Sequence, residues 1–113
     1  QPTILLDAPD SAKVTREEIF GPVICVYGYD EVEDAVARAN DSDYAFQAAV
    51  WGREQDRIAQ AVDGLDAATV MVNDHSAFRV DWMPFGGHKQ SGLGVGGIGY
   101  TMRDYTKHKL VVS

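Results

Sequence analysis

Basic residues, cysteines and long apolar runs are all scarce in this sequence. Ten Lys and Arg stand against 17 Asp and Glu, a net charge of −7, which argues against nucleic acid as a partner because phosphate recognition needs positive surfaces. The single cysteine, Cys25, excludes an internal disulfide and favours a reducing compartment. No apolar run approaches the ~20 residues that cross a bilayer, and no signal peptide is readable at the N-terminus. We therefore expect a cytoplasmic chain without membrane or nucleic-acid partners.

Short apolar runs alternate with amphipathic stretches along the first two thirds of the chain. Because strands separated by helices of about ten residues favour parallel pairing with right-handed crossovers, we expect an α/β fold. Its architecture should be three-layer, with a mostly parallel sheet flanked by helices, in one domain covering residues 1–113. After an apolar run at 3–6, strands are predicted at 23–27, 48–51 and 69–72, and helices at 32–39 and 53–63.

Element ends and buried faces can also be predicted. Asp30 should cap the first helix, with Glu33 at the third helical position, and residues 40–43 should stop that helix. Gly64 suits a left-handed position that ends the second helix. Residues 23–27 are β-branched and apolar nearly throughout, which is typical of a strand covered on both faces. One face of each helix should be buried: Val32, Ala35, Val36 and Ala39 in the first, and Ile58, Ala61, Val62 and Leu65 in the second.

Residues 73–99 show no regular pattern, which is long for a structureless connection in a compact domain. Such stretches are usually functional or disordered. Phe78, Trp82 and Phe85 argue against disorder because large aromatic side chains need a surface to bury against. A short helix is expected near 98–102, and the chain closes on an apolar run at 109–112.

Glu18 and Phe20 precede the apolar strand and are followed by a Gly-Pro pair that breaks regular pairing. A carboxylate on such a loop can accept both hydroxyl hydrogens of a ribose, and a flat apolar ring can form a wall beside a nicotinamide. The alternative from chemistry alone is a solvated glutamate and a core phenylalanine.

Several residue types suggest chemistry that their context denies. Residues 92–97 satisfy the G-x-G-x-x-G pattern, but no strand precedes them and no acidic partner follows, so we expect a close-packed turn into the last helix. Cys25 lies inside an apolar run, which makes a poor nucleophile, and we expect a core residue. His75, His88 and His108 have no metal-site spacing, so no metal is expected.

Two blocks carry a resemblance to a known family: Glu-Glu-Ile-Phe-Gly-Pro-Val at 17–23 and Pro-Phe-Gly-Gly-His-Lys-Gln-Ser-Gly at 84–92. Together they resemble the C-terminal catalytic segment of the NAD(P)-dependent aldehyde dehydrogenase superfamily, and the resemblance runs from residue 2 to residue 112. It implies NAD or NADP as cofactor and an aldehyde substrate, oxidised to a carboxylic acid by thiolate attack, hydride transfer and thioester hydrolysis.

In that family the nucleophilic cysteine, the general base and the dinucleotide-binding turn all precede the first block. The resemblance therefore implies a fragment with no catalytic residue of its own, whose partner is the rest of the enzyme. It also implies that Glu18 holds the nicotinamide ribose, that Phe20 packs near the ring, and that Phe78 and Phe85 line the aldehyde tunnel. Residues 105–113 would join an oligomerisation strand of a homo-oligomer. For Lys89 a structural tether is favoured over a catalytic role.

Two alternatives concern the substrate class and the kind of protein to which this sequence belongs. Residues 78–85 and 96–102 look more like relatives acting on small anionic or hydroxylated aldehydes, so Arg79 could pair with such an anion or with Asp81. Val95 and Lys107 stand where some tetrameric relatives have Arg and Glu, so that interface ion pair does not carry over. The alternative to an enzyme fragment is a free-standing α/β binding or interaction module without catalysis.

Overall fold

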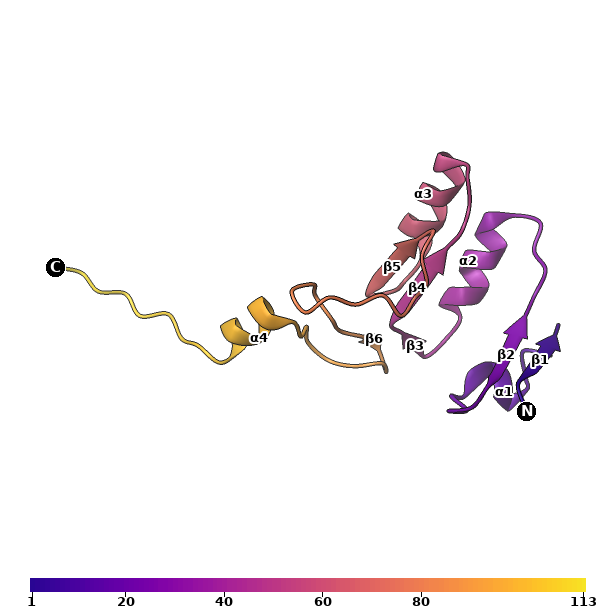
Figure 1. Ribbon diagram of the computed structural model, residues 1–113, viewed down its shortest axis with the longest axis horizontal. Coiled ribbons are helices and arrows are strands. Elements are labelled where there is room, and N and C mark those ends of the chain that lie inside the picture. Colours follow the sequence, from indigo (N-terminus) through magenta and orange to yellow (C-terminus); the bar gives the residue numbers. More distant parts are fainter.

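The computed structural model describes residues 1–113 as six strands and four helices (Figure 1). Strands and helices alternate up to residue 72, as predicted, and irregular backbone dominates beyond it. In chain order the elements are β1 (Thr3–Leu6), α1 (Lys13–Arg16), β2 (Val23–Val26), α2 (Val32–Asn40), β3 (Tyr44–Ala45), β4 (Gln47–Val50), α3 (Gln55–Gly64), β5 (Thr69–Val72), β6 (His88–Lys89) and α4 (Ile98–Asp104).

The N-terminal strands β1 and β2 pair in parallel, with Ile4 opposite Ile24 and Leu6 opposite Val26. Because side chains alternate along a strand, these four residues share one face of the small sheet. That face is open to solvent, with exposures from 44% for Val26 to 73% for Leu6. The prediction that this strand is covered on both faces is therefore wrong for this chain: α1 lies against the half-buried Cys25 side, and nothing covers the other.

Helices α2 and α3 pack against each other beside the parallel β4–β5 pair (Figure 1). Ile58 and Ala61 of α3 and Met71 of β5 are buried, and they form most of the small core. A Cβ on Gly64 would lie 2.9 Å from Cγ1 of Val36 in α2. Glycine at this position thus permits the close approach of the two helices.

Three predicted details of these helices need correction. The N-cap of α2 is Glu31 and not Asp30, and no side chain caps the helix; the amides of Asp34 and Ala35 donate to the Glu31 backbone oxygen. Gly64 lies within α3 and not at a left-handed end, since its role is close packing. Of the residues expected to be buried, Ala39 is exposed and Val32, Ala35, Val36, Val62 and Leu65 are only half-buried.

Parallel pairing is confirmed for β1–β2 and β4–β5, whereas a single continuous sheet is not formed. The strands make three separate two-stranded sheets, the third being the antiparallel β3–β6 pair. The chain is therefore α/β with small parallel sheets. The predicted three-layer arrangement is absent from these residues because no strand joins β2 to β4.

The stretch after β5 is largely irregular, as predicted, and two contacts organise it. β6 pairs with β3, and a bridge joins Phe85 to Gly96. The expected short helix is confirmed as α4, which runs from Ile98 to Asp104. Residues 106–113 form no strand and extend away from the rest of the molecule (Figure 1).

The molecule is elongated and poorly buried for its size. Its extents are 67 × 33 × 23 Å with a radius of gyration of 17.9 Å, against about 13 Å for a compact chain of this length. The accessible surface is 9153 Å², whereas a folded monomer of this mass exposes about 6,100 Å². Only four residues are buried. The excess marks surfaces that these residues alone leave uncovered.

None of the helices has the length and apolarity that a transmembrane segment requires.

Candidate functional site

Phe20 is held out from the protein by an unusual backbone. Its φ is 52°, in the left-handed region that side chains other than glycine seldom adopt, and 93% of its surface is exposed. The reading of Phe20 as a core residue is therefore wrong for this chain. Strain of this kind is retained where the surroundings demand a particular side-chain direction. An aromatic ring presented in this way is available to a flat ligand.

Glu18 lies two residues before Phe20, just after α1, and lines an open cavity of about 540 Å³. Across the cavity lie Tyr44 and Phe46 of the β3–β4 segment and Ser91, which follows β6. No ion pair engages the Glu18 carboxylate, so its oxygens are free to accept hydrogen bonds from a ligand.

A stack of three side chains continues from this cavity into the irregular loop. The Phe46 and Phe85 rings meet edge to face, with centroids 5.1 Å apart and planes at 82°. The Arg79 guanidinium lies over the Phe85 ring, 4.2 Å from the ring centroid. This cation–π contact replaces the alternative pairing with Asp81, since no ion pair joins the two.

Phe78 is not part of this stack. Its amide donates to the His75 carbonyl in a turn, and 44% of its surface is exposed. The structure therefore brings together Arg79 and Phe85, and Phe46 links Phe85 to the cavity that Glu18 lines. Phe20 is close to Glu18 in sequence but does not line that cavity, and Phe78 is separate. Phe46 was missed because a lone aromatic just before a strand carries no distinctive sequence signal.

The glycine-rich turn is close-packed, as predicted. A Cβ on Gly86 would lie 2.5 Å from the Gly94 carbonyl oxygen, and one on Gly97 would lie 2.5 Å from that of Met83. Gly97 also has a φ of 110° and is the N-cap residue of α4. These glycines are explained by backbone contacts within the loop and need no phosphate ligand.

Cys25 is half-buried and not fully in the core as expected, because only one face of its sheet is covered. Its Sγ lies 3.9 Å from the Val14 carbonyl oxygen. Nothing in the hydrogen bonds or ion pairs of the chain provides it with a histidine or carboxylate base. No group of three histidine, cysteine or acidic side chains is placed to hold a metal ion.

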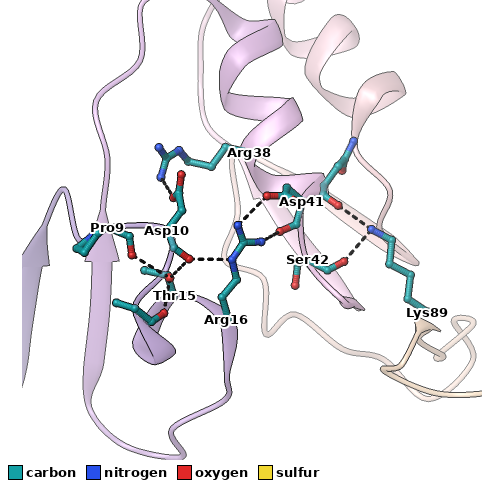
Figure 2. Close-up of polar contacts among 10 residues, drawn as sticks. Pro9, Asp10, Thr15, Arg16, Arg38, Asp41, Ser42 and Lys89 are labelled. Carbon is teal, nitrogen blue, oxygen red and sulfur yellow. Dashed lines mark hydrogen bonds and ion pairs between the residues drawn. The ribbon is translucent and has the colours of Figure 1, made fainter.

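The turn that ends α2, residues 40–43, is bound from two sides (Figure 2). Arg16 donates through Nη2 to Asp41 Oδ2 at 2.9 Å and through Nη1 to the Asp41 carbonyl at 2.5 Å. Lys89 donates through Nζ to the carbonyls of Asn40 at 2.8 Å and Ser42 at 3.0 Å. The Arg16 hydrogen bond is the main cause that lowers the pKa of Asp41 and raises that of Arg16.

A second carboxylate adds to the Lys89 side of this network. Asp66 receives Lys89 at 3.3 Å on one oxygen and His88 Nδ1 at 3.3 Å on the other, and these partners lower its pKa. Asn40 ties the same region to α3 by donating to the Gly64 carbonyl and accepting from the Asp66 amide, both at 2.8 Å. The contacts agree with the tether expected of Lys89. No sequence pattern pointed to Arg16 and Asp41, whose side chains are in contact although they are 25 positions apart.

Known proteins match nearly the whole chain. Residues 1–111 match the model described as "Aldehyde dehydrogenase family". A 3-sulfolactaldehyde dehydrogenase from Priestia aryabhattai is 39% identical over 111 residues, which are 98% of this chain and 23% of the relative. This chain thus spans less than a quarter of that relative's length.

Two solved structures also align with more than nine tenths of this chain. A betaine aldehyde dehydrogenase from Staphylococcus aureus in complex with NAD+ aligns with a TM-score of 0.83 and 32% identity, over 92% of this chain and 20% of that one. A glyceraldehyde-3-phosphate dehydrogenase, GapN, from Methanocaldococcus jannaschii complexed with NADP aligns with a TM-score of 0.81 and 35% identity, over 91% of this chain and 22% of that one.

Proposed function

Because this chain belongs to the aldehyde dehydrogenase family, we propose that it is a C-terminal part of the catalytic domain of an NAD(P)-dependent aldehyde dehydrogenase. In this proposal it supplies cofactor contacts and one wall of the aldehyde tunnel, while the nucleophile and base come from the rest of the polypeptide. The excess surface of about 3,000 Å² over a folded monomer supports a fragment and disfavours a free-standing module.

The observation that carries the proposal is that Glu18 and Phe20, two residues apart, both present side chains that the chain itself leaves free. The Glu18 carboxylate is unpaired at a cavity, and the Phe20 ring is exposed on left-handed, strained backbone. They fit the two ends of a nicotinamide riboside, since the carboxylate can accept from both ribose hydroxyls and the ring can cover one face of a flat heterocycle. When bound, NAD or NADP supplies the hydride acceptor.

The chain's own part in the reaction is positioning. Glu18 would fix the ribose, Phe20 would restrict the nicotinamide face, and Phe78 and Phe85 would exclude water from the aldehyde. Hydride transfer depends steeply on such placement, because a misplacement of about 1 Å can cost on the order of 100-fold in rate. The same proposal includes a cytoplasmic location, and a homo-oligomer joined through residues 105–113.

Glu18→Gln in the complete enzyme tests the cofactor role. Gln keeps the shape but removes the charge that strengthens the hydrogen bonds to ribose, worth about 1 kcal/mol or slightly more. We expect the KM for cofactor to rise about five- to tenfold and hydride transfer to slow, with the melting temperature unchanged. Glu31→Gln is the matched control, because Glu31 is exposed at the start of α2 and does not line this cavity. Unchanged cofactor KM and turnover in the Glu18 variant would remove Glu18 from the site.

For the substrate, we propose a small anionic aldehyde, with Arg79 as its partner. Arg79 is exposed and forms no ion pair, and its guanidinium lies over the Phe85 ring. Its positive charge is therefore available to bind an anion. The 3-sulfolactaldehyde and glyceraldehyde 3-phosphate in two relatives' names are anionic aldehydes, and betaine aldehyde, in a third, is cationic.

Arg79→Lys separates these substrate classes, because it keeps the charge and loses the planar fork that binds two oxygens at once. We expect kcat/KM for 3-sulfolactaldehyde to fall about tenfold, while values for propionaldehyde and betaine aldehyde stay within about twofold. Steady-state kinetics on the three aldehydes makes the comparison. An equal loss on all three would mean that Arg79 supports the loop through Phe85 and does not select anions.

A further inference from the structure

The 40–43 turn at the end of α2 binds one cation from each side, and the two cations come from segments far apart in the sequence. Arg16 contacts Asp41, and Lys89 contacts the carbonyls of Asn40 and Ser42 (Figure 2). The last carbonyls of a helix lack internal partners and carry partial negative charge. The end of α2 is therefore a natural receptor for both side chains.

Each cation makes several bonds, so neither can swing away by losing only one. The Arg16 guanidinium uses Nη1 and Nη2 on Asp41 and its Nε on the Asp10 carbonyl at 3.0 Å. The Lys89 ammonium has three donors, and three acceptors surround it: two carbonyls and the Asp66 carboxylate. No hydrogen bond or ion pair joins Arg16 to Lys89 directly.

Arg16 and Lys89 are each close in sequence to residues of the candidate site. Arg16 is the last residue of α1, two positions before Glu18. Lys89 follows Phe85 closely, pairs across β3–β6 with Tyr44, and has a φ of 50°. A lysine in this backbone region costs on the order of 1–3 kcal/mol and persists where the surroundings over-determine it; here the ammonium contacts do so.

We propose that Arg16 and Lys89 are positioning residues, and that the 40–43 turn is a shared anchor that sets the cofactor segment 17–20 against the substrate loop 73–97. This inference rests on the proposed function and adds a coupling between its two halves. The cavity beside Glu18 agrees with it, because Arg16 and Ser42 line that cavity together with Ser91, next to the Lys89 strand. The anchor forms part of the wall of this cavity, and in the proposal it holds the two segments in place and takes no part in the chemical step.

The test uses Arg16→Met, Lys89→Met and the double variant in the complete enzyme. Lys13→Met is the matched control, since Lys13 is also on α1 but is 86% exposed and pairs only with Glu17. Kinetics are measured well below the lowest melting temperature, with cofactor KM, aldehyde KM and the isotope effect from a deuterated aldehyde. Amide hydrogen exchange is followed in residues 17–20 and 86–97.

We expect Arg16→Met to raise mainly the cofactor KM and Lys89→Met mainly the aldehyde KM. Each variant should slow hydride transfer roughly 10- to 100-fold and enlarge the isotope effect, while Lys13→Met changes neither. The fold-loss in hydride-transfer rate of the double variant should be clearly smaller than the product of the two single fold-losses. Once one segment is no longer held against the turn, holding the other segment no longer aligns the two. Arg16→Lys and Lys89→Arg should restore part of the rate. Each Met variant should also speed exchange in the segment across the turn.

A fall in melting temperature with unchanged kinetics in the folded enzyme would overturn the anchor, and so would strictly multiplicative losses. If the unmodified complete enzyme oxidises no aldehyde, the proposed function fails, and hydrogen exchange then decides the anchor alone. Faster exchange confined to the mutated side would contradict it.

Discussion

The 113-residue chain on its own is expected to oxidise no aldehyde with either NAD or NADP. Cys25 is its single thiol. This thiol is half-buried, and it has no histidine or carboxylate base beside it. Without an activated thiolate there is no covalent step, and the mechanism implied by the resemblance depends on one. Spectrophotometric assay at 340 nm with several aldehydes should give the same rate as a protein-free blank.

One substitution, measured both in the isolated chain and in the complete enzyme, makes this expectation decisive. Cys25→Ser should leave the isolated chain's null activity unchanged, and in the complete enzyme it should leave turnover within about twofold of the unmodified protein. Measurable turnover by the isolated chain that disappears with Cys25→Ser would make Cys25 the nucleophile and would overturn the assignment of this chain as a non-nucleophilic fragment.

The isolated chain is also expected to self-associate. Its surface exceeds that of a folded monomer of the same mass by about 3,000 Å², and a standard protein–protein interface buries about 1,600 Å² in total. The β1–β2 face carries four exposed apolar side chains, and the 110–112 run is also exposed. Unpaired strand edges and apolar faces seek partners. Light scattering should show dimers or larger species, and a hydrophobic dye should bind.

A matched pair of substitutions identifies the responsible surface. Leu6→Glu with Ile24→Lys places opposite charges near each other on the exposed face and leaves the covered face untouched. This double variant should shift the population toward monomer and reduce dye binding several-fold. A strict monomer at high concentration with no dye binding, already in the unmodified chain, would contradict the incompleteness of the fold.

Local patterns predicted the elements well because their causes are local. Residues 69–72 are apolar or β-branched and are followed by Asn73 and Asp74, and they form β5 over the predicted residues. Ile58 and Ala61 are three positions apart, close to one helical turn, and both lie on the buried face of α3. Burial was overestimated for the same reason. The apolar pattern at 23–27 is typical of a strand covered on both faces, whereas in this chain other residues cover only one face of β2.

The site was predictable in part. The Gly-Pro bend and the family blocks pointed to Glu18 and Phe20, and the structure places them at a cavity and on exposed left-handed backbone. The polar anchor was not predictable beyond Lys89. Its bonds join residues up to 49 positions apart, and an arginine and an aspartate 25 positions apart look like ordinary surface charge until the chain is folded.

The most direct test of this account is aldehyde-dependent NAD(P)H formation by the rest of the enzyme, expressed without residues 1–113 of this chain and then combined with them. The account predicts no activity from either piece alone, and activity when both are coexpressed, reduced when the added chain carries Glu18→Gln. Full activity from the remainder without this chain would contradict the claim that these residues complete the cofactor and substrate site.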